Sequence, residues 1–159
     1  MALRVVGHGV RRGQVWGPLV AGGQPRQVEV FVRRFLCRNC NQTMTVGPRV
    51  RLTQRLYSAS AVVLALMLWG LCGLSAGDIR KEVSPWQVPK EEVGWKSVRR
   101  WAQQAVAGKL WPLRGVPLGE AGSLREQVVR LVHQMVAPEL GEDPRQFAHR
   151  AFAQVAGRG

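Results

Sequence analysis

A stretch of 22 residues without a charge lies between Arg55 and Asp78, and it limits the folds open to this chain more than any other segment. Its dense apolar part, from Ala61 to Leu74, is about 14 residues long, because serine and glycine dilute both ends. A membrane-spanning helix needs about 20 predominantly apolar residues, so the pattern favours a buried core helix. The alternative is a small membrane protein with a single span near residues 56–77, because basic residues flank this stretch on both sides as they flank many membrane spans.

Positive charge dominates the rest of the chain. Its 23 Lys and Arg outnumber 10 Asp and Glu, which gives a formal net charge of +13 and favours a polyanionic partner. The first 55 residues hold 10 arginines and a single acid, Glu29. We therefore expect double-stranded DNA, rather than a membrane, as the partner, and we expect the N-terminal part to make most of the contacts.

The sequence points away from catalysis. It lacks the G-x-x-x-x-G-K and H-E-x-x-H patterns, and its acids are scattered, so we expect a protein without catalysis of its own. Three cysteines, two of them in one C-x-x-C, make no disulfide framework and are typical of a reducing compartment. Because residues 1–20 lack the apolar run of a signal peptide, the predicted location is cytoplasmic.

Residues 1–50 are typical of a β module made of short strands that glycine and proline separate. Alternation over residues 28–35 places Val28, Val30 and Val32 on one face of a strand. That strand leads into Cys37 and Cys40, and residues 43–46 form the next strand. Two thiolates at this spacing can bind one tetrahedral zinc ion, so both cysteines are candidate metal ligands.

Zinc is the one cofactor that the sequence suggests, and its site is incomplete in this chain. A structural zinc site needs four ligands, whereas the chain has one C-x-x-C, with His8 as a candidate third ligand. The knuckle is therefore either half of a site whose other half is missing or a relic. Redox chemistry is less favoured, because that use of C-x-x-C usually opens a helix.

Residues 56–111 have the order of a helix-turn-helix domain: the apolar helix, a short helix at about 76–83 and a third helix at about 95–107. The third helix is amphipathic, with basic and amide side chains opposite its apolar face. The loop at 84–94 is longer than the tight turn of this motif. Arginine and glutamine bind base edges and lysine binds phosphate, so the candidate DNA-binding residues are Arg33, Arg34, Lys96, Arg99, Arg100, Gln103 and Gln104.

Residues 112–159 are expected to form a C-terminal helical hairpin. The S-x-x-E at Ser123–Glu126 is a capping box, and Asp143-Pro144 begins a second helix. Both helices are amphipathic, and their apolar faces could form a homodimer. The predicted fold class is thus α+β: a small N-terminal β zinc-ribbon-like module followed by a mainly α-helical helix-turn-helix domain.

One combination of segments resembles a known bacterial arrangement. It comprises Gly7-His8-Gly9, V-E-V-F-V-R-R-F-L-C-R-N-C, Tyr57-Ser58-Ala59, W-G-L-C-G-L-S and G-W-K-S-V-R-R-W. Over residues 5–110 the chain resembles the zinc-ribbon plus helix-turn-helix N-terminal region of bacterial insertion-sequence transposases and their short, uncharacterised relatives. The resemblance implies a mobile-element protein that binds DNA at transposon ends.

The resemblance also implies roles for particular residues. Cys37 and Cys40 would be metal ligands, and the DNA-contacting face would lie on the helix near Lys96 to Gln104. In that family the C-x-x-C is usually the second of two knuckles, and a catalytic domain follows downstream. Neither the first knuckle nor that domain is in this sequence, so the expected protein is non-catalytic, from a truncated or decayed element.

Overall fold

The computed structural model describes residues 4–47, 56–86, 95–111 and 122–157. Within these ranges the chain forms a three-stranded antiparallel sheet followed by five helices, which confirms the α+β class. The elements are β1 (Val5–Pro18), β2 (Pro25–Cys37), β3 (Thr43–Val46), α1 (Ala59–Gly70), α2 (Ala76–Val83), α3 (Ser97–Val106), α4 (Leu124–Met135) and α5 (Pro144–Gly157).

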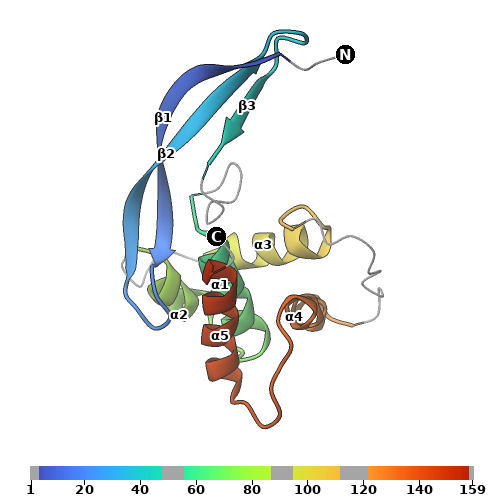
Figure 1. Cartoon of the computed structure of the whole chain (residues 1–159). Helices are drawn as coiled ribbons and strands as arrows, with labels where there is room; N and C mark the ends of the chain where they lie inside the picture. Colours follow the sequence, from blue (N-terminus) through green and yellow to red (C-terminus); the bar gives the residue numbers. More distant parts are fainter. Residues whose placement is uncertain (1–3, 48–55, 87–94, 112–121, 158–159) are drawn as a thin grey trace.

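The sheet is a long ribbon that projects from the cluster of helices (Figure 1). Its strand order is β1-β2-β3, and a turn within residues 19–24 joins β1 to β2. The expectation of several short strands was wrong for the first segment, because β1 is one strand of 14 residues. Its glycines do not interrupt it: a bulge between Gly7 and Val10 absorbs the irregularity, with Gly9 at φ 90°.

Alternation along β2 follows the prediction. Val32 is buried at 2% exposure, whereas its neighbour Phe31 is 59% exposed on the opposite face. Val28 and Val30 are half-buried on the face of Val32. The ribbon therefore has one face turned partly inward and one turned to solvent.

The uncharged stretch folds as a short buried helix followed by a turn. α1 has 12 residues, about 18 Å of helix, and it ends before the apolar run does. Gly73, at φ 65°, allows the backbone N–H of Leu74 to donate back to Leu68 O at 3.1 Å, and α2 begins at Ala76 as expected. Each helix among the described residues is too short or too polar to span a membrane.

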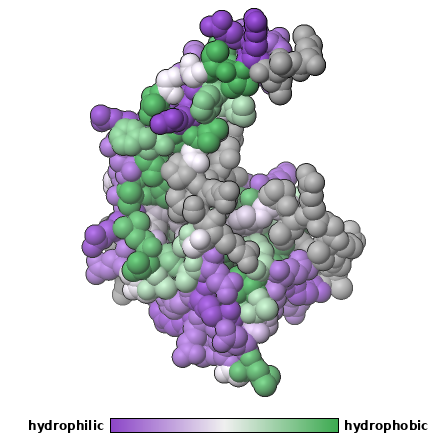
Figure 2. All heavy atoms as spheres, viewed as in Figure 1, coloured by the Kyte–Doolittle hydropathy of each residue, from purple (hydrophilic) through white to green (hydrophobic). Residues whose placement is uncertain are grey.

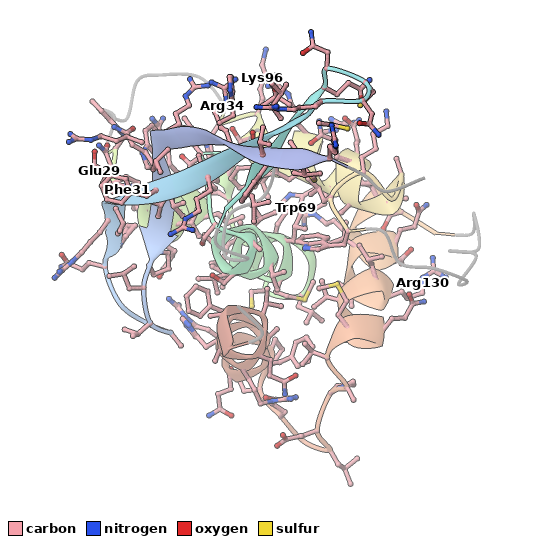
Figure 3. All side chains as sticks on the ribbon, turned by 45° about the horizontal axis from the view of Figure 1, so that its top comes forward. Glu29, Phe31, Arg34, Trp69, Lys96 and Arg130 are labelled. Atoms are coloured by element: carbon pink, nitrogen blue, oxygen red, sulfur yellow. The ribbon has the colours of Figure 1, made fainter. Side chains whose placement is uncertain are left out.

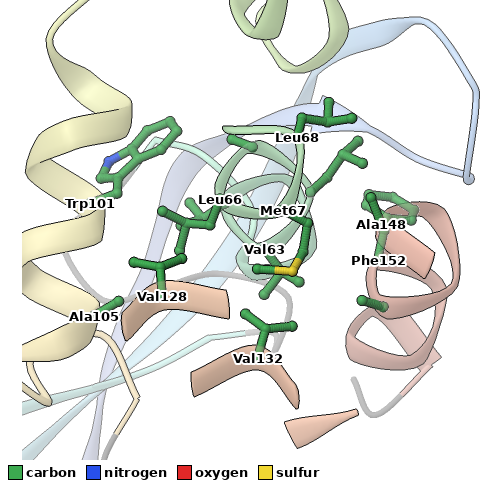
Figure 4. Close-up of a cluster of buried hydrophobic side chains, with 14 of the residues drawn as sticks. Val63, Leu66, Met67, Leu68, Trp101, Ala105, Val128, Val132, Ala148 and Phe152 are labelled. Atoms are coloured by element: carbon green, nitrogen blue, oxygen red, sulfur yellow. The ribbon is translucent and has the colours of Figure 1, made fainter. Parts of the chain in front are cut away.

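The other helices surround α1. α5 makes the most extensive contact with it, and α4, α2 and α3 also pack against it (Figures 1 and 4). Every residue of α1 from Ala59 to Leu68 is buried. One hydrophobic core contains residues of all five helices, including Leu66, Trp101, Val128 and Phe152. The predicted helical segments 56–111 and 112–159 thus share a core.

The predicted capping box forms: Ser123 and Glu126 make both of its hydrogen bonds and begin α4. Ser58 Oγ accepts from the backbone N–H of Ala61 and begins α1. α3 is slightly shorter than predicted, since it begins at Ser97, and Lys96 at its N-cap makes no side-chain cap hydrogen bond.

A leucine in α1 tests whether this helix organises the core. Leu66 is fully buried, so Leu66→Ala should lower the free energy of unfolding by about 2–5 kcal/mol through reduced burial and the cavity it leaves. Leu140→Ala is the matched control, because Leu140 is fully exposed and should change stability by less than about 0.5 kcal/mol. Urea unfolding followed by circular dichroism measures both, and equal decreases would contradict a core centred on α1.

Candidate nucleic-acid interface

The base of the ribbon is fixed to the start of α1 by main-chain hydrogen bonds. The backbone N–H of Trp16 donates to Leu56 O at 2.7 Å, and the N–H of Ser58 donates to Trp16 O at 2.9 Å. Next to them Gly17 has φ 140°, and a Cβ there would lie 2.6 Å from Ala61 Cβ. Only glycine permits this close approach, so the strand and the helix meet without a side chain between them.

Five aromatic residues extend this joint to α3. We call Trp16, Tyr57, Trp86, Trp95 and Trp101 the aromatic cluster. Trp16 contacts Tyr57 edge-on with ring centroids 5.5 Å apart, and Tyr57 contacts Trp101 at 4.9 Å. Trp95 packs edge-on against Trp101 at 5.2 Å, and Trp86 lies 6.1 Å from Trp16. Such contacts link β1, the entry to α1 and the start of α3, so the ribbon and α3 hold a defined relation to each other.

Tyr57 is the centre of the aromatic cluster. Its hydroxyl donates to Ser84 Oγ at 3.0 Å, just after α2. Burial raises the pKa of the Tyr57 phenol, while the hydrogen bond to Ser84 and the charge of Arg80 oppose that rise. The phenol therefore stays neutral over the physiological pH range and serves as a structural hydrogen-bond donor.

The ribbon carries most of the cationic side chains. The described part of the ribbon contains Arg4, Arg11, Arg12, Arg26, Arg33, Arg34 and Arg38, against one acid, Glu29. Glu29 lies 3.8 Å from Arg12, and both side chains are more than half exposed, so solvent screens the pair strongly. A strong positive potential therefore remains along the ribbon.

Arg33 and Arg34 lie on opposite faces of β2. Arg33 is opposite Val10 on β1 and Val46 on β3, and it is exposed. Arg34 is opposite Thr45 and is half-buried. The structure thus does not bring the two predicted arginines onto one surface, because successive residues of a strand alternate.

The face of Arg33 also exposes large apolar side chains. Phe31 is 59% exposed and Val10 is 63% exposed, and the same face carries Met44 and Val46 of β3. Figure 2 shows hydrophobic and hydrophilic residues mixed along the projecting ribbon. This combination of guanidinium groups and apolar surface suits contact with phosphates and with the apolar parts of bases and sugars.

α3 presents the other predicted residues. It buries Val98, Trp101, Ala102 and Ala105 against α1 and α4, as its periodicity predicts. The opposite face exposes Lys96, Arg99, Arg100 and Gln103, whereas Gln104 is half-buried. In the view of Figure 3, Lys96 and Arg34 both lie near the top of the molecule.

The relation of α2 to α3 bears on the helix-turn-helix prediction. α2 packs against α1 and against strands β1 and β2, while α3 packs against α1 and α4. Residues 87–94 of the connecting loop lie outside the described residues. The helix-turn-helix assignment therefore stays a prediction.

Cys37 and Cys40 lie at the far end of the ribbon, where β2 turns into β3 as predicted. Asn41 N–H donates to Cys37 O at 2.8 Å, and Asn41 takes the left-handed conformation, φ 56°, that this type of turn requires. The pKa of Cys37 lies below the usual thiol value, chiefly because the backbone N–H of Cys40 donates to its sulfur. The side chain of Cys40 and the N–H of Asn39 lower it further.

These two thiols would supply two of the four ligands that a structural zinc site needs. No group of three or more His, Cys, Asp or Glu within the described residues could hold a metal, so His8 does not join the two cysteines there. Two thiolates do not complete the four-ligand tetrahedral shell that structural zinc takes. The described residues alone therefore do not fit a closed zinc site.

Sequence patterns did not predict one contact on this surface, the cation–π contact between Trp69 and Arg125. The Arg125 guanidinium lies 4.9 Å from the centroid of the Trp69 ring, between the end of α1 and the start of α4. Helical periodicity places Trp69 in the core, yet it is half-buried, and Arg125 stands within the capping pattern with no sign of a partner. No local signal pairs them, because they are distant in the sequence and meet only after α4 packs on α1.

Comparison with known proteins does not assign the chain to a family. No protein-family model, no curated protein and no solved structure matches it. The resemblance to insertion-sequence transposases therefore rests on the matching segments alone. It stays a prediction, as do the roles that it implies for Cys37 and Cys40.

The two thiol environments predict different reactivities. The pKa of Cys37 is lowered by N–H donors, whereas burial and the nearby Asp143 raise the pKa of Cys72. The thiolate is the nucleophile, so at pH 7 iodoacetamide should modify Cys37 several-fold faster than Cys72. As the pH is lowered, reaction at Cys72 should fall off at higher pH than reaction at Cys37.

Peptide mass spectrometry after timed quenching measures both rates in the folded chain. The urea-unfolded chain is the control, and there the thiols should react at similar rates. Faster labelling of Cys72 than of Cys37 in the folded chain would contradict the assigned environments.

Proposed function

We propose that this chain is a cytoplasmic, non-catalytic, transposase-related protein that binds duplex DNA through the ribbon and α3. One observation carries the proposal: two cationic surfaces, far apart in sequence, are joined by the aromatic cluster. A rigid pair of surfaces can contact two places on one polyanion without the entropic cost of ordering a hinge. Its origin in a bacterial mobile element is proposed from the resemblance alone.

The ribbon supplies affinity in this proposal. A two-stranded antiparallel ribbon fits the major groove of B-DNA, and exposed arginines on it can contact the phosphates on either side. Phosphate contacts release counterions, so they dominate affinity and make it strongly dependent on salt. The exposed Phe31 and Val10 on the Arg33 face offer apolar contacts to thymine methyl groups or deoxyribose.

α3 supplies sequence preference in this proposal. Its exposed Arg100 and Gln103 are side chains that make bidentate contacts with guanine and adenine edges. Lys96, at the start of the helix, meets phosphate. Gln104 is half-buried and makes contacts within the protein, so its part in binding bases is smaller than that of Gln103.

The proposal does not depend on zinc or on a dimer. The apolar faces of α4 and α5 are buried within the chain, through residues such as Val128, Val132, Phe147 and Phe152. A homodimer through the C-terminal helices would have to use their outer surfaces. The homodimer stays a prediction. Measuring the mass of the chain in solution over a range of concentrations tests it.

Removal of ribbon charge should weaken binding uniformly. The double variant Arg33→Gln/Arg34→Gln should lower affinity by the same factor on every duplex. The slope of log affinity against log salt should fall by up to about 0.9 for each phosphate that the variant no longer neutralises. Fluorescence anisotropy over a salt series measures both quantities.

A control variant removes the same two charges elsewhere. Lys81 and Arg145 are ion-paired on α2 and α5, outside both proposed surfaces, so Lys81→Gln/Arg145→Gln should leave the salt slope nearly unchanged. Equal weakening by the two double variants would show that net charge alone, and not the ribbon, determines binding.

Changes on α3 should act on preference instead. Arg100→Ala/Gln103→Ala should reduce the ratio of affinities for selected and scrambled duplexes by about tenfold, since a bidentate base contact contributes roughly 1–3 kcal/mol of discrimination. The selected duplex comes from a randomised pool enriched on the wild-type chain. The ribbon variant should keep this ratio, and uniform weakening by the α3 variant would contradict base contacts by α3.

A further inference from the structure

A pocket of about 460 Å³, open to solvent and called the cavity below, lies between the end of α1 and the starts of α3 and α4. Trp69 comes from α1, Trp95 and Lys96 precede α3, Arg99 is on its first turn, and Ser123 and Arg125 begin α4. Figure 3 shows Trp69 between the helices, below Lys96 in that view. Ligand sites usually enclose about 300–1,000 Å³, so the cavity has room for one small ligand.

The charges at this cavity favour an anion. Three cationic side chains, Lys96, Arg99 and Arg125, line it from two helices, and all three are exposed to solvent. The described residues that line it include no acid. Glu126 lies on α4 but does not line the cavity, because its carboxylate accepts from the backbone N–H of Ser123 at 2.7 Å.

The aromatic residues favour a flat ligand. Trp69 and Trp95 are half-buried, and both line the cavity, so parts of two indole rings face the same space. Arg125 already lies over the Trp69 ring, 4.9 Å from its centroid. A guanidinium on an indole makes a planar surface on which a nucleobase can stack.

We propose that this cavity binds one nucleotide, with the base against Trp69 and Arg125 and the phosphate held by Lys96 and Arg99. An apolar or uncharged aromatic ligand would leave the cations unused, and a bare phosphate would leave the indoles unused. The nucleotide is either free or an unpaired nucleotide at a DNA end, because a base within a duplex cannot expose its face. The second source rests on the proposed function.

The cavity also separates two arginines that are adjacent in sequence. Arg99 lines the cavity, whereas Arg100 is exposed on α3 but does not line it. Arg99 belongs to the nucleotide site and Arg100 to the surface that contacts the duplex. This pair provides a matched comparison, because both are exposed arginines on the first turns of one helix.

The test compares Arg99→Gln with Arg100→Gln in the full chain. The probes are inorganic phosphate, deoxyadenosine monophosphate, a blunt duplex and the same duplex with a short single-stranded overhang containing 2-aminopurine. Stacking contributes roughly 1–3 kcal/mol per base, so the wild-type chain should bind the overhang duplex about tenfold more tightly than the blunt one. Quenching of 2-aminopurine should report stacking directly.

Arg99→Gln should abolish this preference for the overhang and should weaken binding of the blunt duplex less than Arg100→Gln does. Arg100→Gln should weaken binding of both duplexes and keep the preference. A third outcome is that the wild-type chain binds free mononucleotide, Arg99→Gln abolishes this binding, and neither chain prefers the overhang duplex. That outcome would support the site with a free nucleotide as its ligand.

Two results would overturn the nucleotide site. If inorganic phosphate competes for the site as well as the mononucleotide does, the cavity is a simple anion site. If the chain neither binds the mononucleotide nor prefers the overhang duplex, the cavity is not a nucleotide site. In both cases, salt-dependent binding of blunt duplex would leave the proposed function intact. If no duplex binds, the proposed function fails, and the mononucleotide still tests the cavity alone.

Discussion

The burial of α1 on all sides is the constraint on which the other elements depend. Ten consecutive residues, from Ala59 to Leu68, are withdrawn from solvent, so no face of the helix remains for water. A helix of this kind requires a cover on every side, and α2, α3, α4, α5 and the base of β1 together supply it. The amphipathic helices therefore turn their polar faces outward, and this places the cations of α3 on the surface.

A second constraint joins the ribbon to this core. A hairpin carries no core of its own and is marginally stable in isolation, so its position must be fixed at its base. The main-chain hydrogen bonds between Trp16 and the residues before α1 provide this attachment, and Gly17 allows the close approach. The aromatic cluster then carries the attachment to α3, so each cationic surface is placed by the same set of rings.

Local patterns in the sequence predicted the elements well, because caps and turns are decided by neighbours in the chain. The capping box at Ser123 and the start of α2 after Ser75 both form as expected. The length of β1 could not be predicted, because cross-strand pairing with β2 overrides the local effect of its glycines. The candidate site was predicted only in part: the exposed face of α3 followed from periodicity, whereas the contact of Arg125 with Trp69 depends on tertiary packing.

The ribbon combines two properties that make a bound partner energetically favourable. Its 14-residue first strand extends about 46 Å, and its exposed Phe31, Val10 and Met44 leave apolar surface in water. Its arginines repel one another with only Glu29 to offset them. A polyanion relieves the repulsion and covers the apolar groups at once, and any ligand that binds only the folded state adds to its stability. The side chains that limit the stability of the free ribbon are thus those that a nucleic acid would contact. Binding of a nucleic acid would therefore also raise the stability of the ribbon.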